Sequence, residues 1–139
     1  MIKVEDTISR VIICFLTLLF LFYGFMFTGA ESATAFIERL GVDSGNIDAN
    51  HLQMTANLGW IYIVFAIAFV ATLLAPIEQS TVFFRMMLLG SFINSIRLII
   101  IYMGADGGAN PVPMIASILV FVLMNILYNR SGMRIGVTM

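Results

Sequence analysis

The chain contains 139 residues, of which 60 % are hydrophobic and only 11 % carry a charge. Soluble domains carry about 25 % charged residues, so this composition excludes an ordinary water-soluble domain and favours one embedded in lipid. The formal net charge of −1 argues against nucleic acid as a partner, because proteins that bind it present a basic surface to the phosphates. The length suits a single domain with no separate enzymatic part.

Four apolar segments are long enough to cross a bilayer. A hydrocarbon core of about 30 Å needs roughly 20 helical residues at 1.5 Å each. The expected spans are 11–29, 57–75, 82–103 and 111–128. The second closes before Pro76, and the fourth opens at Pro111, where proline is tolerated in a first helical turn. The sequence therefore predicts an all-α integral membrane protein, a four-transmembrane-helix bundle that forms one domain over residues 1–139.

The first segment has an alternative interpretation as a cleaved signal peptide. Lys3 and Arg10 give it a basic start, and Thr28–Ala30 loosely resembles a small-residue cleavage site. The apolar core of a signal peptide usually has about 7–15 residues, whereas this one has 19 and follows Glu5 and Asp6. We therefore expect a retained helix, with Cys14 as a small buried hydrophobic residue within it.

Basic residues predict the orientation of the chain. Five of them flank the spans on one side, namely Lys3, Arg10, Arg85, Arg130 and Arg134. The connections on the other side, 30–56 and 104–110, contain only Arg39. Because Lys and Arg near span ends stay in the cytoplasm, both termini are predicted to face the cytoplasm.

The connection 30–56 is predicted to contain a short helix that lies in the membrane interface. Ser32 is the expected N-cap and Gly41 the expected stop. Apolar residues recur between them at helical spacing, namely Ala33, Phe36, Ile37 and Leu40. Asp48 is expected to cap the next helix, which would then begin outside the membrane.

Arg97 is the most informative polar residue of the spans. A cation in hydrocarbon costs about 2.5–3.5 kcal/mol, so it should face other helices, a cavity or the interface. Arg97 stands seven residues before Gly104, or about 10 Å below the helix end. In one interpretation its side chain snorkels to the surface, with or without Asp106 as a partner.

The other interpretation places Arg97 in a polar seam between the third and fourth spans. Gly90, Asn94, Arg97 and Ile101 share one helical face, with Ser91 and Ser95 beside it. The fourth span offers Ser117, Phe121, Asn125 and Tyr128 at the same spacing. The candidate residues of a ligand site or helix seam are Arg97, Asn94, Ser91 and Asn125. Such a seam would either join the helices or let Arg97 and Asn94 hold an anionic head group, a carboxylate or a quinone-like carbonyl.

Other chemistry has little support in the sequence. His51 follows Asp48 by three residues, but a metal site needs three or four ligands, so no metal or other cofactor is expected. The spans contain neither a histidine that would activate a serine nor a pair of carboxylates for proton relay. We therefore expect no enzymatic activity.

The order of motifs resembles an uncharacterised family of small bacterial four-helix membrane proteins that is similar to the DoxX group in size and layout. The resemblance covers about residues 10–130 and rests on the Gly24 region, the segment Asn50–Gly59, and Ile96–Leu98 followed by Asp106–Gly107 and Pro111. It implies the four-helix fold and no activity. The chain departs from the family pattern at Gln53, where relatives often have an arginine, and by lacking an acidic residue in the fourth span.

Together with this resemblance, these features favour a multi-pass protein of the bacterial inner membrane that is an accessory subunit and packs against other membrane protein subunits within the lipid bilayer. The alternative is a free-standing binder or carrier of a lipid-like or anionic small molecule, such as a quinone-like compound, through the Arg97–Asn94 seam. An enzyme acting on a lipid is a third interpretation, which the absence of acid–base residues at depth disfavours.

Overall fold

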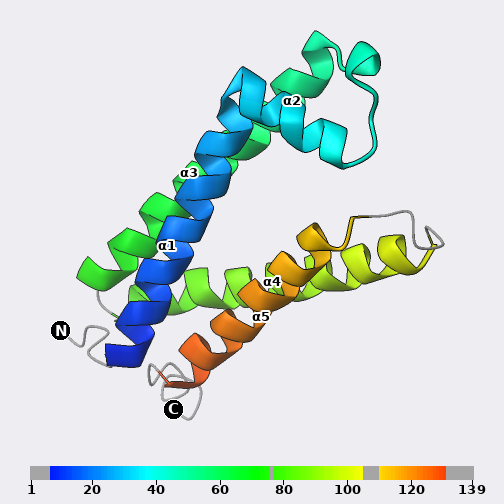
Figure 1. The fold of residues 1–139 in the computed structure, drawn as a ribbon. Coiled ribbons are helices and arrows are strands. Elements are labelled where there is room, and N and C mark those ends of the chain that lie inside the picture. Colours follow the sequence, from blue (N-terminus) through cyan, green and yellow to red (C-terminus); the bar gives the residue numbers. More distant parts are fainter. Residues whose placement is uncertain (1–6, 76, 105–109, 131–139) are drawn as a thin grey trace. The chain divides into compact units, whose positions relative to one another are not determined.

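The computed structural model describes residues 7–75, 77–104 and 110–130, with the side chains of 77–79 excepted (Figure 1). Within these ranges the chain is helical and contains no strand. The elements in order are α1 (Thr7–Thr28), α2 (Ala30–Arg39), the short 3₁₀ helix η1 (Ser44–Asn46), α3 (Ala49–Leu74), α4 (Ile77–Gly104) and α5 (Val112–Arg130).

Four of these helices, α1, α3, α4 and α5, are long and apolar enough to cross a membrane, as predicted for a multi-pass membrane protein. In α4 the candidate span covers Ser80–Gly104. α3 starts at Ala49, well before the expected span, because Asp48 caps it. The Asp48 carboxylate accepts the backbone N–H of His51 at 3.0 Å, which confirms the predicted cap.

Contacts divide the chain into two units. One unit is Phe15–Phe69, which contains most of α1, all of α2 and most of α3. The other contains α4, α5 and the described residues 7–14 and 70–75. Each unit is described separately below.

Within the unit Phe15–Phe69, α1 and α3 lie side by side and approach each other closely at two glycines (Figure 1). A Cβ atom on Gly59 would stand 2.7 Å from the carbonyl oxygen of Gly24, and one on Gly24 would stand 2.6 Å from Cγ1 of Ile63. Small residues of this kind allow two membrane helices to pack backbone against backbone. On either side of the crossing, Phe20 and Phe27 of α1 contact the ring of Tyr62 at 5.3 and 5.6 Å.

α2 follows α1 after a single residue, and its cap differs from the prediction. Gly29 is the N-cap, whereas Ser32 lies inside the helix and donates its hydroxyl to the carbonyl of Met26 at 2.6 Å. The prediction for Ser32 is wrong because the last carbonyls of α1 compete for its hydroxyl. The predicted stop is confirmed: Gly41 adopts φ +93°, and its N–H donates to the carbonyl of Glu38.

The apolar side of α2 packs onto α1. The ring of Phe36 contacts that of Phe27 at 4.7 Å, and Ile37 is buried. The charged residues Glu38 and Arg39 are exposed.

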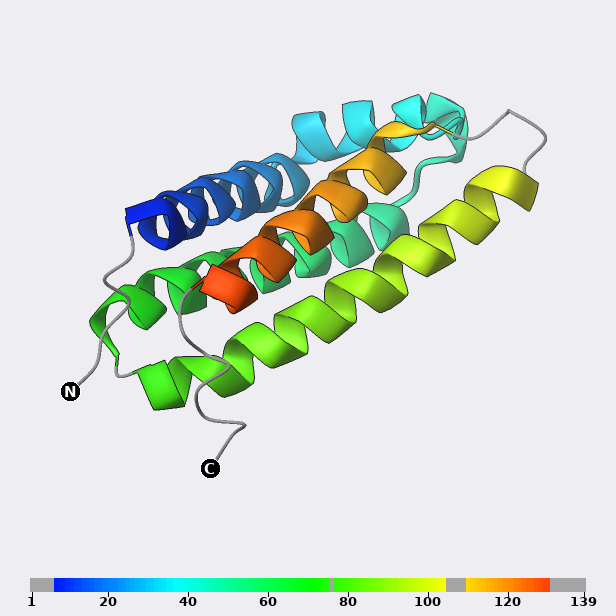
Figure 2. The same cartoon turned by 90° about the horizontal axis from the view of Figure 1, so that it is seen from below.

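In the other unit, α4 and α5 lie side by side and antiparallel (Figure 2). The pairs that join them are Arg85 with Tyr128, Phe92 with Phe121, and Ser95 with Ser117. Residues farther along α4 therefore pair with residues earlier in α5, and these three pairs define the register of the two helices.

Cys14, which was expected to be buried, is exposed. The prediction is wrong because the outer face of a membrane helix is as apolar as its packed face, so hydrophobicity alone does not tell the two apart.

Candidate functional site

A polar seam joins α4 and α5, as the sequence predicts. The Asn94 side-chain amide donates to the hydroxyl of Ser117 at 3.0 Å. The hydroxyl of Ser95 lies 3.1 Å from the same Ser117 oxygen, and both serines are buried. A hydrogen bond between helices spares these groups contact with hydrocarbon, so the seam stabilises the pair.

Two of the predicted site residues lie apart from these cross-helix bonds. Ser91 is buried and donates its hydroxyl to the carbonyl of Leu88 in its own helix at 3.0 Å. Its own backbone carbonyl accepts the hydroxyl of Ser95 at 2.7 Å, so Ser91 positions a seam residue. Asn125 is exposed and accepts the side-chain amide of Asn129 within α5.

Arg97 is exposed, and its guanidinium makes no hydrogen bond or ion pair with any side chain or backbone group that the structure describes. Asp106, which the sequence offered as a partner, lies outside the described residues. Gly90, Asn94 and Ile101, which share a helical face with Arg97, are also exposed. We call Gly90, Asn94, Arg97 and Ile101 the arginine face of α4.

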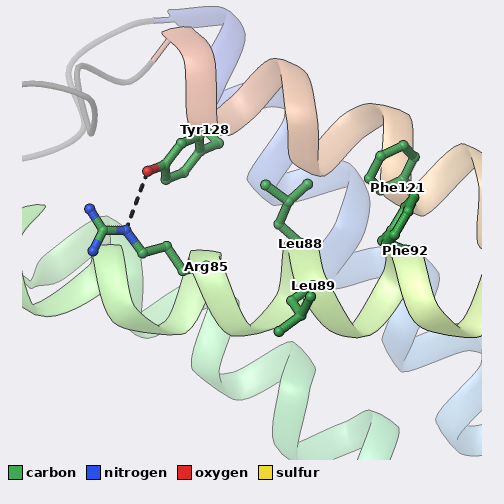
Figure 3. Close-up of a pocket in the computed structure, with 6 residues that line it drawn as sticks. All are labelled: Arg85, Leu88, Leu89, Phe92, Phe121 and Tyr128. Carbon is green, nitrogen blue, oxygen red and sulfur yellow. Dashed lines mark hydrogen bonds between the residues drawn. The ribbon is translucent and has the colours of Figure 1, made fainter. Parts of the chain in front are cut away.

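A second polar feature lies elsewhere on the same helix pair. A shallow groove of about 360 Å³ runs between α4 and α5 (Figure 3). The residues that line it are Arg85, Leu88, Leu89, Phe92, Phe121 and Tyr128. We call it the α4–α5 groove.

Charge and polarity in the groove are confined to one end. There Arg85 donates from Nε to the hydroxyl of Tyr128 at 3.3 Å. Farther along, the rings of Phe92 and Phe121 contact each other at 5.4 Å (Figure 3). The groove thus has a cationic, hydroxyl-bearing mouth and an apolar floor.

From the sequence, Arg85 counts among the basic residues that flank the spans and Tyr128 belongs to the polar face of the fourth span, but no pairing between them is predicted. A signal was present, because Arg85 precedes Phe92 by seven residues and Tyr128 follows Phe121 by seven. In antiparallel helices this equal spacing, about two turns, brings the polar pair and the aromatic pair into register.

The start of α3 holds a further interaction outside the spans. Nδ1 of His51 lies 2.8 Å from the Asp48 carboxylate. The backbone N–H of His51 and its ring stabilise the ionised carboxylate, so the pKa of Asp48 lies below its ordinary value. The hydrogen bond from the His51 backbone makes this pair a helix cap, and no three metal-binding side chains come together among the described residues.

Comparison with protein-family models, curated proteins and solved structures gives no match. The resemblance to DoxX-like proteins therefore stays a prediction, and function is argued from the arrangement above.

Proposed function

We propose that this chain is a non-catalytic accessory subunit that packs against a larger complex in the bacterial inner membrane. The observation that supports this proposal most strongly is the arginine face of α4. It places a guanidinium that pairs with none of the described side chains, and the small residue Gly90, on an exposed surface of an apolar helix.

A protein partner would cover the arginine face within the membrane. Exposing a guanidinium to hydrocarbon costs about 2.5–3.5 kcal/mol, which a partner with oriented acceptors would remove. A Cβ on Gly90 would meet nothing within 4 Å, so this part of α4 leaves room for a neighbouring helix to approach closely. Arg97 would then fix the orientation of the partner, and Gly90 would permit the contact.

In the membrane, we propose that the four spans form a bundle with both termini in the cytoplasm. Five basic residues near the span ends against one favour this orientation. α2 would lie in the opposite interface, since its exposed side carries Glu38 and Arg39 and its other side is apolar.

The second candidate function is a free-standing binder or carrier of an anionic or lipid-like molecule at Arg97 and Asn94. The Asn94 amide is held by Ser117, so it is preoriented one turn from Arg97. A ligand with two acceptors would be recognised by these two side chains.

The test is native mass spectrometry of the full chain extracted from its own membranes in mild detergent. A stoichiometric second protein is expected, and Arg97→Leu should release it. Arg97→Lys should release it as well, because a point charge on a flexible stem does not reproduce the planar fork of a guanidinium.

Arg39→Gln is the matched control, since it removes a positive charge from α2, outside the spans, and should leave the complex intact. Recovery of the chain alone or as a homodimer would contradict the subunit proposal. A small-molecule adduct that both Arg97→Leu and Asn94→Leu remove would support the binder instead.

A further inference from the structure

We propose that the α4–α5 groove binds an anionic phospholipid, with its phosphate at Arg85 and Tyr128 and one acyl chain along Leu88, Phe92 and Phe121 (Figure 3). This site differs from the arginine face. At 100° per residue, Arg97 lies about 120° around the helix axis from Arg85. The inference therefore holds whether or not the chain is a subunit of a complex.

The hydrogen bond between Arg85 and Tyr128 leaves N–H and O–H donors of both side chains available to a ligand. Arg85 uses Nε toward Tyr128, and its two terminal nitrogens bond to none of the described residues. The Tyr128 oxygen accepts that N–H, so its own O–H proton is available to another acceptor. A guanidinium and a hydroxyl that are already fixed to each other thus offer several donors to one anion, and arginine forks suit phosphate oxygens.

The position and length of the groove along the helix pair suit the head group and acyl chain of a lipid. Arg85 lies three residues after the start of the expected span 82–103, and Tyr128 is the last residue of the expected span 111–128. Tyrosine and arginine at this depth are at head-group level. From Arg85 to Phe92 the groove extends about 10 Å, roughly two thirds of one leaflet of a 30 Å hydrocarbon core. A phosphate at the mouth would therefore direct its acyl chain along the apolar floor.

Charge disfavours a second copy of the chain as the occupant. None of the eight acidic residues lies within the expected spans 11–29, 57–75, 82–103 and 111–128. A second copy packed symmetrically on the groove would bring its own Arg85 to the first one, with no carboxylate at that depth. The floor is open to lipid, since Leu89 is 60 % and Phe92 is 45 % exposed.

The experiment uses the full chain in phosphatidylcholine vesicles that contain phosphatidylglycerol with a photoreactive acyl chain. Irradiation followed by peptide mass spectrometry should label α4 near Leu89 and Phe92 and α5 near Phe121. Unlabelled phosphatidylglycerol should compete for these positions, and added phosphatidylcholine should not. A basic residue at an anionic membrane surface changes binding about fivefold, so Arg85→Gln should lower this labelling about fivefold.

Tyr128→Phe should cause a smaller loss, and Arg39→Gln, the control for charge, should cause none. Equal labelling of the groove and of the exposed Phe22 and Phe25 of α1 in the unmodified chain would show bulk lipid only and overturn the proposal. Disulfide-linked dimers formed by Leu89→Cys, in a chain that also carries Cys14→Ser, would identify a second chain as the occupant. Loss of labelling with Arg97→Gln but not with Arg85→Gln would show that the lipid binds at the arginine face and not in the α4–α5 groove. The labelling map of the unmodified chain decides the question even if a variant fails to fold.

Discussion

The crossing of α1 and α3 at Gly24 and Gly59 predicts a large effect for a single methyl group. In Gly59→Ala, the new Cβ would lie 2.7 Å from the carbonyl oxygen of Gly24 and 2.9 Å from Cγ2 of Thr28. Ordinary contacts of a Cβ begin at 3.4 Å, so the backbones must separate by about 0.7 Å (3.4 − 2.7). A carbonyl within a helix does not move alone, and the whole helix has to shift.

Overpacking of this kind typically costs about 1–3 kcal/mol. In lipid, helix association depends on close van der Waals contact, so separating α1 from α3 weakens the interaction that holds them together. The gap would also loosen the contacts of Tyr62 with Phe20 and Phe27. We therefore expect Gly59→Ala to destabilise the Phe15–Phe69 unit by about 1–3 kcal/mol.

The assay is reversible unfolding in mixed micelles with increasing denaturing detergent, followed by circular dichroism and by the emission of Trp60, the single tryptophan of the chain. Gly90→Ala is the matched control, since a Cβ there meets nothing within 4 Å and alanine favours the helix. Gly59→Ala should unfold at lower detergent than both the unmodified chain and Gly90→Ala. Equal midpoints for the two variants would refute the close crossing.

The remaining predictions concern hydrogen bonds. In a double-mutant cycle on the free energy of unfolding, Asn94→Leu and Ser117→Ala should couple by about 0.6 kcal/mol, the mean for such bonds in membranes. In a second cycle, the effects of Arg97→Lys and Asn94→Leu should be additive. Coupling between Arg97 and Asn94, with none between Asn94 and Ser117, would show that Asn94 interacts with Arg97 instead. Asp48→Ala should speed hydrogen exchange of the His51 amide, and Asp48→Asn, which keeps an acceptor, should speed it less. The pKa of Asp48 is lowered in the folded chain. The stabilisation from its carboxylate is therefore complete above the unfolded pKa and is lost as pH falls through the folded one, so protection that persists in strong acid would contradict the cap.

The four long helices were predictable because their signal is local. A run of about 20 apolar residues has few alternatives to a membrane helix. The cap at Asp48 and the stop at Gly41 were predictable for the same reason, since each depends on residues within one turn.

The groove was not predicted, because the equal spacing of its polar and aromatic residues becomes informative only once the register between the two helices is known. The sequence places Arg85 and Tyr128 near span ends, but only packing decides that they meet. The prediction that Ser32 caps α2 was wrong for a related reason, because its hydroxyl donates to the carbonyl of Met26 in the preceding helix. Part of the seam was predictable, since Asn94 and Ser117 are polar groups in apolar helices and each needs a partner.

The most direct test of the central claim, a four-span protein with cytoplasmic ends, is a pair of reporter fusions. Alkaline phosphatase is active only outside the cytoplasm, whereas green fluorescent protein fluoresces only inside it. Fused after Met139, the phosphatase should be inactive and the fluorescent protein bright; fused after Asp43, between the first two spans, the phosphatase should be active. An active phosphatase at Met139 would contradict either the number of spans or their orientation.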